Sequence, residues 1–504
     1  MGSSKRETWA TRLGLILAAA GNAVGLGNIL RFPSKAALYG GGAFMVPYFI
    51  SLLLLGLPVM ILEWVIGRVA GRKGHGSMTG ILGTFFNQAT WSRILGSVGI
   101  AIPVIIVMYY IYIESWVLGY AILSLFGQLP KPVVTSDYKE AMAPFVNFFR
   151  AYTAPSITAL IFLWITLGIN WIILQRGIAK GIEITGKIGI PGLILIGLIL
   201  SYVALSVRDW SGIEGLKFVY NLNLSGIKDP NIWVEAAGQI FFTLSLGMGA
   251  IATYASYVKP KEDVVKAGIL TASVNEFVEL VIGASIVIPA AFAMFGALSV
   301  PELAKEGTFR IGFMTMPAIL LNLSMGTLIS FLWFVLLFLA ALTSSLALIQ
   351  PLVAFFEDEM KWSHTKSVSI SMLIVILGAH LCAFIPVFID ELDFWAGSFL
   401  LIFFALIEIF VFVWAFGLNN FYKELITDTS IRLPKFFVYI LGIISPLFIL
   451  FIGYFWFSEK LLDTLKEPDP YKWLARTFLL LLILLLVILA VISKKRVLRE
   501  ERGV

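Results

Sequence analysis

The amino-acid sequence predicts an all-α integral membrane protein with about twelve transmembrane helices. Of its 504 residues, 59% are hydrophobic and only 13% are charged. Soluble globular chains carry about 25% charged residues, so this chain has too few polar side chains to cover a water-facing surface. The mean hydropathy of +0.91 agrees. In addition, apolar runs of roughly 20 residues, long enough to cross a hydrocarbon core, recur along the whole chain.

Twelve apolar runs are expected to be the membrane spans. A single run of this kind is also typical of a buried helix in a soluble protein, but a series of twelve is not. The expected spans are 10–38, 41–70, 92–125, 156–175, 182–206, 232–257, 264–295, 327–356, 366–385, 391–417, 435–458 and 470–493.

Basic residues gather in the loops that share one side of the membrane if both ends of the chain are inside. Examples are Arg68, Arg72 and Lys73 after the second span, and Lys494 and Lys495 after the last. This positive-inside bias predicts cytoplasmic N- and C-termini. It also accounts for the net charge of +6 without a nucleic-acid partner. No cleavable signal peptide is expected before the first span.

The first and sixth expected spans are both interrupted near their middle. Gly21, Gly25 and Gly27 lie beside Asn22 and Asn28 in the first span. Glycines alone are also typical of closely packed helices, but buried asparagines need polar partners. The sixth span has Thr, Ser and Gly over 243–249. Interruptions at corresponding positions of two halves indicate a midplane transport site, where free backbone amides attract carboxylates and free carbonyls attract cations.

Other polar groups lie inside the membrane spans. Thr343, Ser344 and Ser345 occur together in the eighth span, although such hydroxyls also bond back to their own helix. Asn275, Glu276 and Glu279 occur in the seventh, where a carboxylate indicates function. Glu63 and Glu408 are interpreted as structural hydrogen-bond acceptors. His75 and His380 are interpreted as loop and packing residues, since three histidines give no metal-site spacing.

Several stretches, in order and over nearly the whole chain, resemble the neurotransmitter:sodium symporter family, and within it prokaryotic members such as the bacterial leucine transporter (LeuT). They are 9–17 (WATRLGLIL), 21–28 (GNAVGLGN), 31–33 (RFP), 40–44 (GGGAF), 112–116 (YIESW), 238–247 (GQIFFTLSLG), 253–258 (TYASYV), 342–345 (LTSS) and 393–397 (DFWAG). The resemblance implies a single transporter domain, 1–504, with the LeuT fold and discontinuous helices 1 and 6. Helices 1–5 (10–206) would form the first repeat, helices 6–10 (232–417) its inverted copy, and helices 11–12 (435–493) a peripheral pair.

The resemblance also implies two sodium sites made of oxygen ligands, as a hard cation requires. The first would use Ala23, Asn28, Thr243 and Asn275. The second would use the carbonyls of Gly21, Val24 and Ala340 and the hydroxyls of Thr343 and Ser344. The substrate-binding residues carried over from the family are Ala23, Leu26, Gly27, Ile106, Tyr110, Phe242, Thr243, Ser245, Met248, Ser344 and Leu348.

Two positions, Gly25 and Met248, indicate the chemical class of the substrate. Family members for monoamines carry an acidic residue where this chain has Gly25, so the substrate is expected to bring its own carboxylate. The expected side-chain pocket is apolar apart from two serines, which predicts a hydrophobic L-amino acid. Met248 replaces a phenylalanine of the leucine transporter, and because methionine is adaptable in shape, aromatic as well as aliphatic side chains are expected to fit.

Gates and charge balance also follow from the resemblance. The outer gate would pair Arg31 with Asp393 above a lid of Tyr110 and Phe242. The inner gate would consist of Arg6, Trp9, Ser256, Tyr257 and Asp358. Glu279 would replace the chloride ion that other members need, so transport is expected to be independent of chloride. After sodium leaves, this buried carboxylate would lack a cation and take a proton, which predicts proton antiport.

The expected function is import of a hydrophobic L-amino acid with two sodium ions, by alternating access, in the plasma membrane of a prokaryote and with a homodimer as the expected assembly. An enzyme is not expected, because no catalytic pair or metal-ligand spacing occurs. A carrier with two parallel six-helix halves usually has a long central inner loop, whereas the loop near residue 258 is short. The alternative is a non-transporting receptor or sensor of the same fold. Uptake of labelled amino acid into proteoliposomes would distinguish a transporter from such a receptor.

Overall fold

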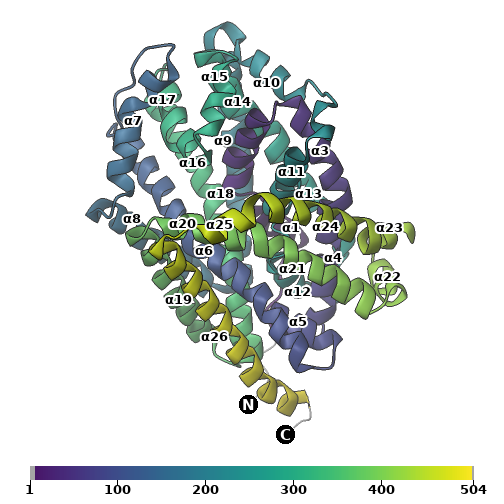
Figure 1. Ribbon diagram of the computed structural model, residues 1–504. Coiled ribbons are helices and arrows are strands. Elements are labelled where there is room, and N and C mark those ends of the chain that lie inside the picture. Colours follow the sequence, from purple (N-terminus) through teal and green to yellow (C-terminus); the bar gives the residue numbers. More distant parts are fainter. Residues whose placement is uncertain (1–5, 502–504) are drawn as a thin grey trace.

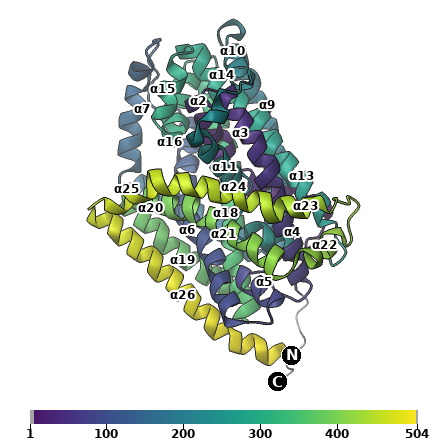
Figure 2. The same ribbon diagram turned by 45° about the vertical axis from the view of Figure 1, so that its right-hand side comes forward.

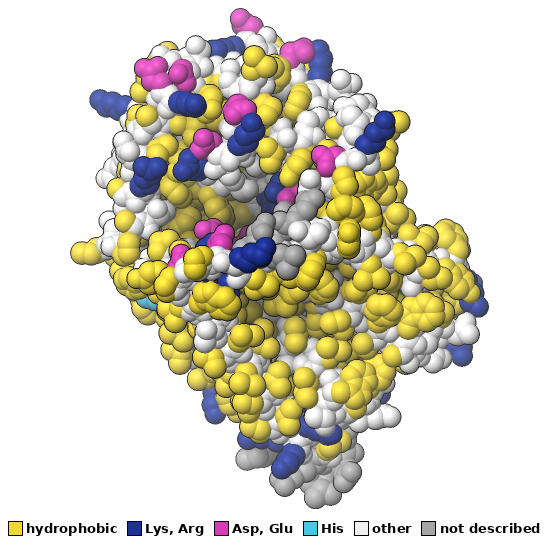
Figure 3. Space-filling model, in the orientation of Figure 1, with side chains coloured by type: hydrophobic (Ala, Val, Ile, Leu, Met, Phe, Trp, Pro, Cys, Tyr) yellow, Lys and Arg dark blue, Asp and Glu magenta, His cyan; other side chains and the backbone are white. Residues whose placement is uncertain are grey.

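The computed structural model describes residues 6–501, with the side chains of 459, 460, 462, 463 and 499–501 excepted. The described chain consists of helices and connecting loops, without strands. The first and last described residues lie at the same end of the molecule (Figures 1 and 2). On the face drawn in Figure 3, Lys and Arg side chains without visible Asp or Glu mark this end, whereas both signs of charge mix at the opposite end. Because its first and last residues lie at the same end, the described chain runs the length of the helical bundle an even number of times.

Within residues 6–501, ten helices are long and apolar enough to cross a membrane, and one bent pair brings the number to eleven. The sixth expected span forms two short helices, α11 and α12, so that the described chain accounts for all twelve expected segments. The helices of the first half are α1 (Arg12–Ala23), η1 (Gly27–Arg31), α2 (Phe32–Leu38), α3 (Gly42–Ser51), η2 (Leu52–Gly56), α4 (Leu57–Gly71), α6 (Thr90–Leu125), α8 (Ile157–Gln175), η3 (Ile178–Ile182) and α9 (Glu183–Trp210).

The second half follows the expected spans equally closely. Its helices are α11 (Pro230–Thr243), α12 (Ala250–Ser256), α13 (Val264–Glu276), η5 (Phe277–Gly283), α14 (Ala284–Phe295), α18 (Gly326–Ala354), η7 (Phe355–Glu359), α19 (His364–Phe384), α20 (Val387–Leu392), η8 (Asp393–Leu400), α21 (Leu401–Ile409), η9 (Phe410–Ala415), α23 (Phe436–Tyr439), η10 (Ile440–Ile444), α24 (Ser445–Trp456), η11 (Phe457–Leu461) and α26 (Pro470–Glu501).

Short helices that the apolar runs do not predict lie in the connections. They are α5 (Met78–Phe85), α7 (Tyr138–Thr153), α10 (Gly212–Tyr220), η4 (Ser225–Lys228), α15 (Ser299–Lys305), α16 (Thr308–Arg310), η6 (Ile311–Thr315), α17 (Met316–Leu320), α22 (Leu418–Ile426) and α25 (Leu462–Lys466). Among the connections, the sequence predicts short helical pieces only over 301–316, in an outer loop. Helices of this length leave no membrane-length apolar signal in the sequence.

Burial separates the core of the bundle from its periphery. The most apolar 18-residue stretch of α6 is 83% buried, whereas that of α26 is 33% buried. Both ribbon views place α24 and α26 along the outside (Figures 1 and 2). Exposed side chains on α26, including Leu480, Leu481 and Leu484, form part of the apolar surface that would face lipid. Functional groups are therefore expected around α6 and α18.

The two interrupted helices owe their breaks to local sequence. Helix α1 ends at Ala23 and the chain bends by 50° before α2. Between α11 and α12, Gly247 and Gly249 adopt φ of 69° and 66°. A Cβ on Gly247 would lie 2.1 Å from the carbonyl oxygen of Leu401, so the position requires glycine. The Gly247 amide donates to Glu63 Oε1 at 2.8 Å, which satisfies a backbone group freed by the break.

Candidate functional site

The breaks in the first and sixth spans meet α6 and α18 around a central cavity of about 30 Å³. Its lining includes ten of the eleven expected substrate-binding residues, and the described residues around it carry no formal charge. The lining residues are Asn22, Ala23, Gly25, Gly27, Asn28, Ile106, Tyr110, Phe242, Thr243, Ser245, Met248, Ser344 and Leu348. The structure thus brings together, from four separate segments, groups that the sequence places far apart.

The eleventh expected residue, Leu26, lies on the outer side of the same break. It lines an outer cavity, and its amide donates to Tyr110 Oη at 3.2 Å. Backbone amides and a tyrosine hydroxyl therefore meet at one end of the central cavity. A Cβ on Gly25 would lie 2.9 Å from both Tyr110 Oη and Ser344 Oγ, so an acidic side chain there would require these two hydroxyls to shift.

The residues expected at the first sodium site form one buried cluster. Asn28 Nδ2 donates to Thr243 Oγ1 at 2.8 Å and to Asn275 Oδ1 at 2.9 Å. Asn28 Oδ1 accepts from the Gly25 amide at 2.8 Å, which ties the cluster to the break in α1. Ala23 lines the adjoining cavity. A cation in this cluster needs the amide of Asn28 turned so that its oxygen faces inward, and the remaining ligands are then oxygen atoms, as sodium requires.

The five residues expected at the second sodium site also converge. Ser344 Oγ lies 3.3 Å from the Gly21 carbonyl oxygen, 3.2 Å from that of Val24 and 3.1 Å from that of Ala340. Thr343 Oγ1 lies 3.2 Å from the Ala340 oxygen. The hydroxyls come from α18 and two of the carbonyls from the break in α1. This all-oxygen set fits a sodium ion that would hold α1 against α18.

A buried carboxylate adjoins the first cluster. Glu279 is fully buried on η5 and accepts from Tyr48 Oη and Gln239 Nε2, each at 3.0 Å. Asn28 Nδ2 also donates to it at 2.8 Å, and the Thr243 hydroxyl donates to the same oxygen. The family resemblance implies that three of these donors, Tyr48, Gln239 and Thr243, match the positions around the chloride ion of chloride-dependent members. The Glu279 carboxylate therefore lies at the centre of four side-chain hydrogen-bond donors, which is an arrangement that binds an anion.

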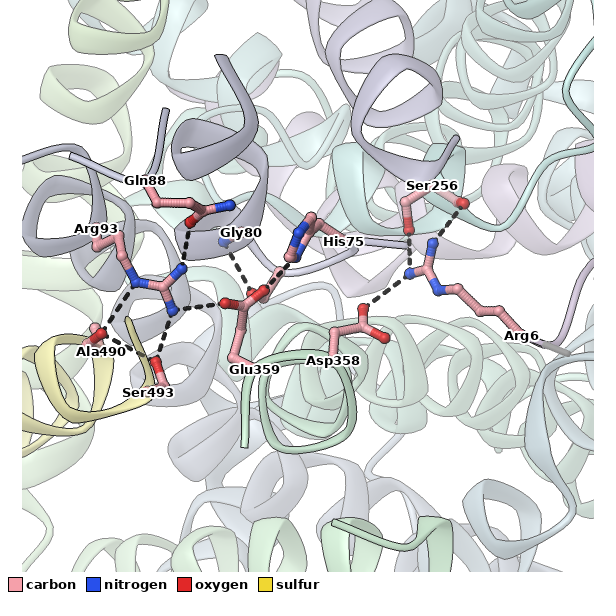
Figure 4. Close-up of polar contacts among 11 residues, drawn as sticks. Arg6, His75, Gly80, Gln88, Arg93, Ser256, Asp358, Glu359, Ala490 and Ser493 are labelled. Atoms are coloured by element: carbon pink, nitrogen blue, oxygen red, sulfur yellow. Dashed lines mark hydrogen bonds and ion pairs between the residues drawn. The ribbon is translucent and has the colours of Figure 1, made fainter. Parts of the chain in front are cut away.

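Direct contacts close the side of the cavity that faces the first described residues (Figure 4). The Arg6 guanidinium donates to the Ser256 carbonyl at 2.9 Å, to Ser256 Oγ at 3.0 Å and to Asp358 Oδ2 at 3.0 Å. It also lies over the ring of Tyr257, 4.3 Å from its centroid. Burial by itself lowers the pKa of Arg6, but Asp358 and Tyr257 outweigh burial and raise that pKa. Trp9 Nε1 donates to the Tyr254 carbonyl at 2.9 Å, so all five expected inner-gate residues come together.

The outer side is hollow. A cavity of about 260 Å³ lies above the central one, and Tyr110 and Phe242 line both, so these two rings form the partition between them. Within the described residues, Arg31 and Asp393 form no ion pair. Arg31 lies over the Phe242 ring at 4.6 Å, and Asp393 accepts from Tyr109 Oη at 2.7 Å. The expected outer-gate residues thus line one cavity without closing it.

A model of the sodium:neurotransmitter symporter family matches residues 6–146 and 156–500. The chain belongs to this family. Its members are transporters, so the symporter is not placed among enzymes. It is 28% identical over 461 residues to an uncharacterized sodium-dependent transporter of Methanocaldococcus jannaschii, with 89% of each chain covered. It is 30% identical over 389 residues to the uncharacterized sodium-dependent transporter YhdH of Bacillus subtilis, covering 76% of this chain and 80% of YhdH.

Other comparisons bear on fold and ions. A sodium- and chloride-dependent taurine transporter of Rattus norvegicus is 27% identical over 502 residues, covering 90% of the symporter and 78% of that protein. The crystal structure of MhsT in complex with L-phenylalanine superimposes with a TM-score of 0.77 at 30% identity, covering 89% of this chain and 99% of MhsT. The symporter is therefore a sodium-dependent, multi-pass membrane protein with the LeuT fold.

Several residues of the symporter's site were not found by sequence reasoning. Lys35 Nζ lies 2.7 Å from Glu235 Oε2 in the outer cavity. Arg93 donates to Glu359 at 2.6 Å, directly beside the inner-gate residue Asp358 (Figure 4). His75 lies buried in the loop between α4 and α5, as interpreted, and its Nδ1 also lies 2.6 Å from Glu359 Oε1, a contact that the sequence did not predict. The adjacent acidic pair 358–359 at the end of a span was the available signal.

The two other intramembrane carboxylates of the symporter differ. Glu63 accepts from the Gly247 amide, which agrees with its interpretation as a structural acceptor. Glu408 does not follow that interpretation, since neither carboxyl oxygen has a hydrogen-bond partner among the described residues. Sequence alone could not separate these two carboxylates, because each occurs once in an apolar helix.

Proposed function

We propose that this symporter imports a hydrophobic L-amino acid together with sodium by alternating access. The central cavity carries the proposal, because it combines free backbone groups at two helix breaks with uncharged walls. The Leu26 and Gly27 amides and Tyr110 Oη would bind the substrate carboxylate. The carbonyls of Ala23 and Phe242 and the hydroxyls of Thr243 and Ser245 would face its ammonium group.

The substrate side chain would lie between Ile106, Tyr110, Phe242, Met248 and Leu348, with Ser245 and Ser344 at the edge. A charged side chain would find no opposite charge among these residues, and burying an unpaired charge is costly. The complex of MhsT, a relative at 30% identity, with L-phenylalanine supports this choice. The shape adaptability of Met248 supports acceptance of both aliphatic and aromatic side chains.

Two sodium ions would couple binding to the closed inner gate. The first cluster joins the break in α1 to α11 and α13, and the second joins it to α18. Ions at these places bind only the arrangement in which the segments meet, so they shift the population toward it. The substrate carboxylate would complete the first site. Release toward the cytoplasm would then require the loss of the ion between α1 and α18.

Glu279 would make the symporter independent of chloride, since a fixed negative charge already lies beside the first sodium site. When sodium and substrate leave, the buried carboxylate loses its cation, and uptake of a proton relieves the unpaired charge. Proton antiport during the return step follows. The chloride-dependent relatives supply the contrast against which this part of the proposal is tested.

The remaining parts of the proposal concern organisation. Helices 1–5 (10–206) and 6–10 (232–417) would be inverted repeats, with 435–493 peripheral. Basic residues gather at the end where the first and last described residues lie, which supports cytoplasmic termini. Relatives in Methanocaldococcus, Haemophilus and Bacillus support the plasma membrane of a prokaryote. The exposed apolar flanks would contact lipid or a second copy of the chain.

Equilibrium binding to the purified protein tests the substrate class. Labelled leucine should bind in sodium but not in potassium, and unlabelled tryptophan or methionine should displace it. Tryptamine, which lacks the carboxylate, should not. Lysine and glutamate should displace it poorly. Equal displacement by tryptamine and tryptophan contradicts recognition of the carboxylate, and binding of lysine or glutamate without leucine contradicts the hydrophobic pocket.

A further inference from the structure

Asn22 differs from every other residue of the central cavity in having a buried amide without a partner. Its side chain is 1% exposed, and within the described residues neither Nδ2 nor Oδ1 makes a hydrogen bond. Most buried polar side-chain atoms in proteins have a partner, because an unmade hydrogen bond costs about 1–3 kcal/mol. The other asparagines of this region, Asn28 and Asn275, are hydrogen-bonded within the first sodium cluster.

The position of Asn22 indicates what its amide would meet. It lies in the last turn of α1 and lines the cavity. Its backbone carbonyl accepts from Ser245 Oγ at 3.0 Å and from Ser344 Oγ at 3.4 Å, the two serines of the expected side-chain pocket. Asn22 therefore lies beside the two serines of the expected side-chain pocket and lines the same cavity. The carboxylate end is formed by the residues after the break, from Gly25 to Gly27.

We propose that Asn22 is a specificity-determining residue that hydrogen-bonds a neutral polar group on the substrate side chain. An amide both donates and accepts, so it suits a hydroxyl or an indole N–H. The preferred substrates are then amino acids with an apolar side chain that carries one such group, such as tyrosine, tryptophan or threonine. This inference rests on the proposed function, which predicts only that the side chain is uncharged and mainly apolar.

Pairs of amino acids that differ at one polar group provide the test. We compare tyrosine with phenylalanine and threonine with valine. The hydroxyl group lies far from the α-carbon in tyrosine and close to it in threonine. Their affinities are measured by displacement of labelled phenylalanine in sodium. Substitution Asn22→Leu keeps the branched shape of the side chain and replaces the amide by methyl groups. It should lower the affinity for the hydroxylated member of at least one pair by about tenfold relative to its apolar partner, which is the size of one buried hydrogen bond.

Matched variants separate this role from a structural one. Asn22→Ser retains a donor and acceptor and should restore part of the preference. Thr271→Val removes a buried hydroxyl that has no partner among the described residues but does not line the cavity, and it should leave both ratios unchanged. If Asn22→Leu is not monodisperse, Asn22→Ala removes the same amide without apolar bulk.

The outcomes are distinct from those of the proposed function. If the wild type binds phenylalanine and valine, but both ratios stay within about twofold in Asn22→Leu and Asn22→Ala, Asn22 binds only water and the inference is wrong. If the wild type binds none of the four amino acids in sodium, the proposed function itself fails. Equal loss of all four affinities in the Asn22 variants, with no change in ratio, also contradicts the inference.

Discussion

The two ends of the transport pathway carry the same kinds of side chain, but these side chains are in contact at one end and apart at the other. At the inner gate Arg6 contacts Asp358 at 3.0 Å, and two oxygens of Ser256 accept from the same guanidinium. On the outer side Arg31 and Asp393 line a cavity of about 260 Å³ and each contacts an aromatic residue instead of the other. An arginine and an aspartate therefore close one gate and leave the other open.

The difference teaches that the gate residues alone do not decide which side is closed. Exposed ion pairs contribute only about 0–1 kcal/mol, so a single pair cannot hold a gate against bulk water. The inner pair is supported by the Tyr257 ring and by the bond from Trp9 to Tyr254. It is also supported by the two oxygen clusters that hold α1 in place. The outer pair lacks such support in this conformation, which is closed at the Arg6 gate.

Breaking the inner gate should have the largest effect. Arg6→Ala removes three hydrogen bonds at once and should favour the state open to the cytoplasm. We expect leucine affinity in sodium to fall by about 30-fold or more, because losing one partner of a desolvated charge pair costs about 2–5 kcal/mol. A cysteine introduced at the buried Thr253 should then react with a water-soluble thiol reagent, and the natural Cys382 is buried.

Arg72→Ala is the matched control for this prediction. Arg72 pairs with Asp428 at 2.9 Å and Glu424 at 3.6 Å, outside the gate. Its loss should change leucine affinity by less than about twofold, the scale of an exposed ion pair. Similar effects of both arginine substitutions would show that the inner gate carries no special role.

Substitutions at the expected second sodium site should destabilise the closed inner gate by a smaller amount than Arg6→Ala. Thr343→Val and Ser344→Ala each delete a hydroxyl ligand and provide no replacement. Leucine binding should then need about tenfold more sodium, because the ion no longer favours the arrangement of α1 against α18. Sodium titrations of leucine binding measure this shift, and circular dichroism checks the fold. Unchanged sodium dependence in both variants would place the ion elsewhere.

Removing the Glu279 carboxylate beside the first sodium cluster should have an intermediate effect, on the chloride dependence of transport. The wild type should transport equally well when gluconate replaces chloride. Glu279→Ser removes the fixed carboxylate but keeps a hydroxyl, and its transport should become dependent on chloride, with about a tenfold loss in gluconate, since the buried sodium then lacks a counter-charge. Loss of wild-type transport in gluconate would refute chloride independence.

The outer pair should give the smallest effect on binding. Asp393→Asn keeps the bond from Tyr109 and removes a charge that makes no ion pair here. Leucine affinity should change by less than about threefold, while uptake into vesicles slows, because closure over the substrate needs the charged pair. An effect on equilibrium binding as large as that of Arg6→Ala would show that both gates are closed in the binding state.

Much of the fold could be predicted from the sequence, because membrane spans are long apolar runs and each expected run coincides with described helices. The breaks at Gly21–Asn28 and 243–249 also gave the place of the central cavity. Connecting helices such as α5 and α7 were missed, since their lengths and mixed compositions do not differ from those of loops. The site residues came from the family resemblance and not from spacing, because their contacts join segments more than 200 residues apart.

Two features depend on geometry that no sequence pattern reports. Whether Arg31 contacts Asp393 depends on the conformation, and the sequence specifies both the open and the closed state. The unpartnered amide of Asn22 is apparent only when its neighbours are known, since an asparagine in a membrane span usually finds a partner on an adjacent helix. Sequence reasoning singled out Asn22 as a polar residue at the break but assigned it no role.

Uptake of labelled leucine into proteoliposomes tests the central claim most directly. The vesicles hold potassium gluconate, and the outside solution contains either sodium gluconate or potassium gluconate. The account predicts accumulation above the outside concentration only with the inward sodium gradient, without any chloride, and its loss in Thr343→Val. Equal uptake with sodium and potassium, or tight sodium-dependent binding without any accumulation, would contradict a sodium-coupled symporter.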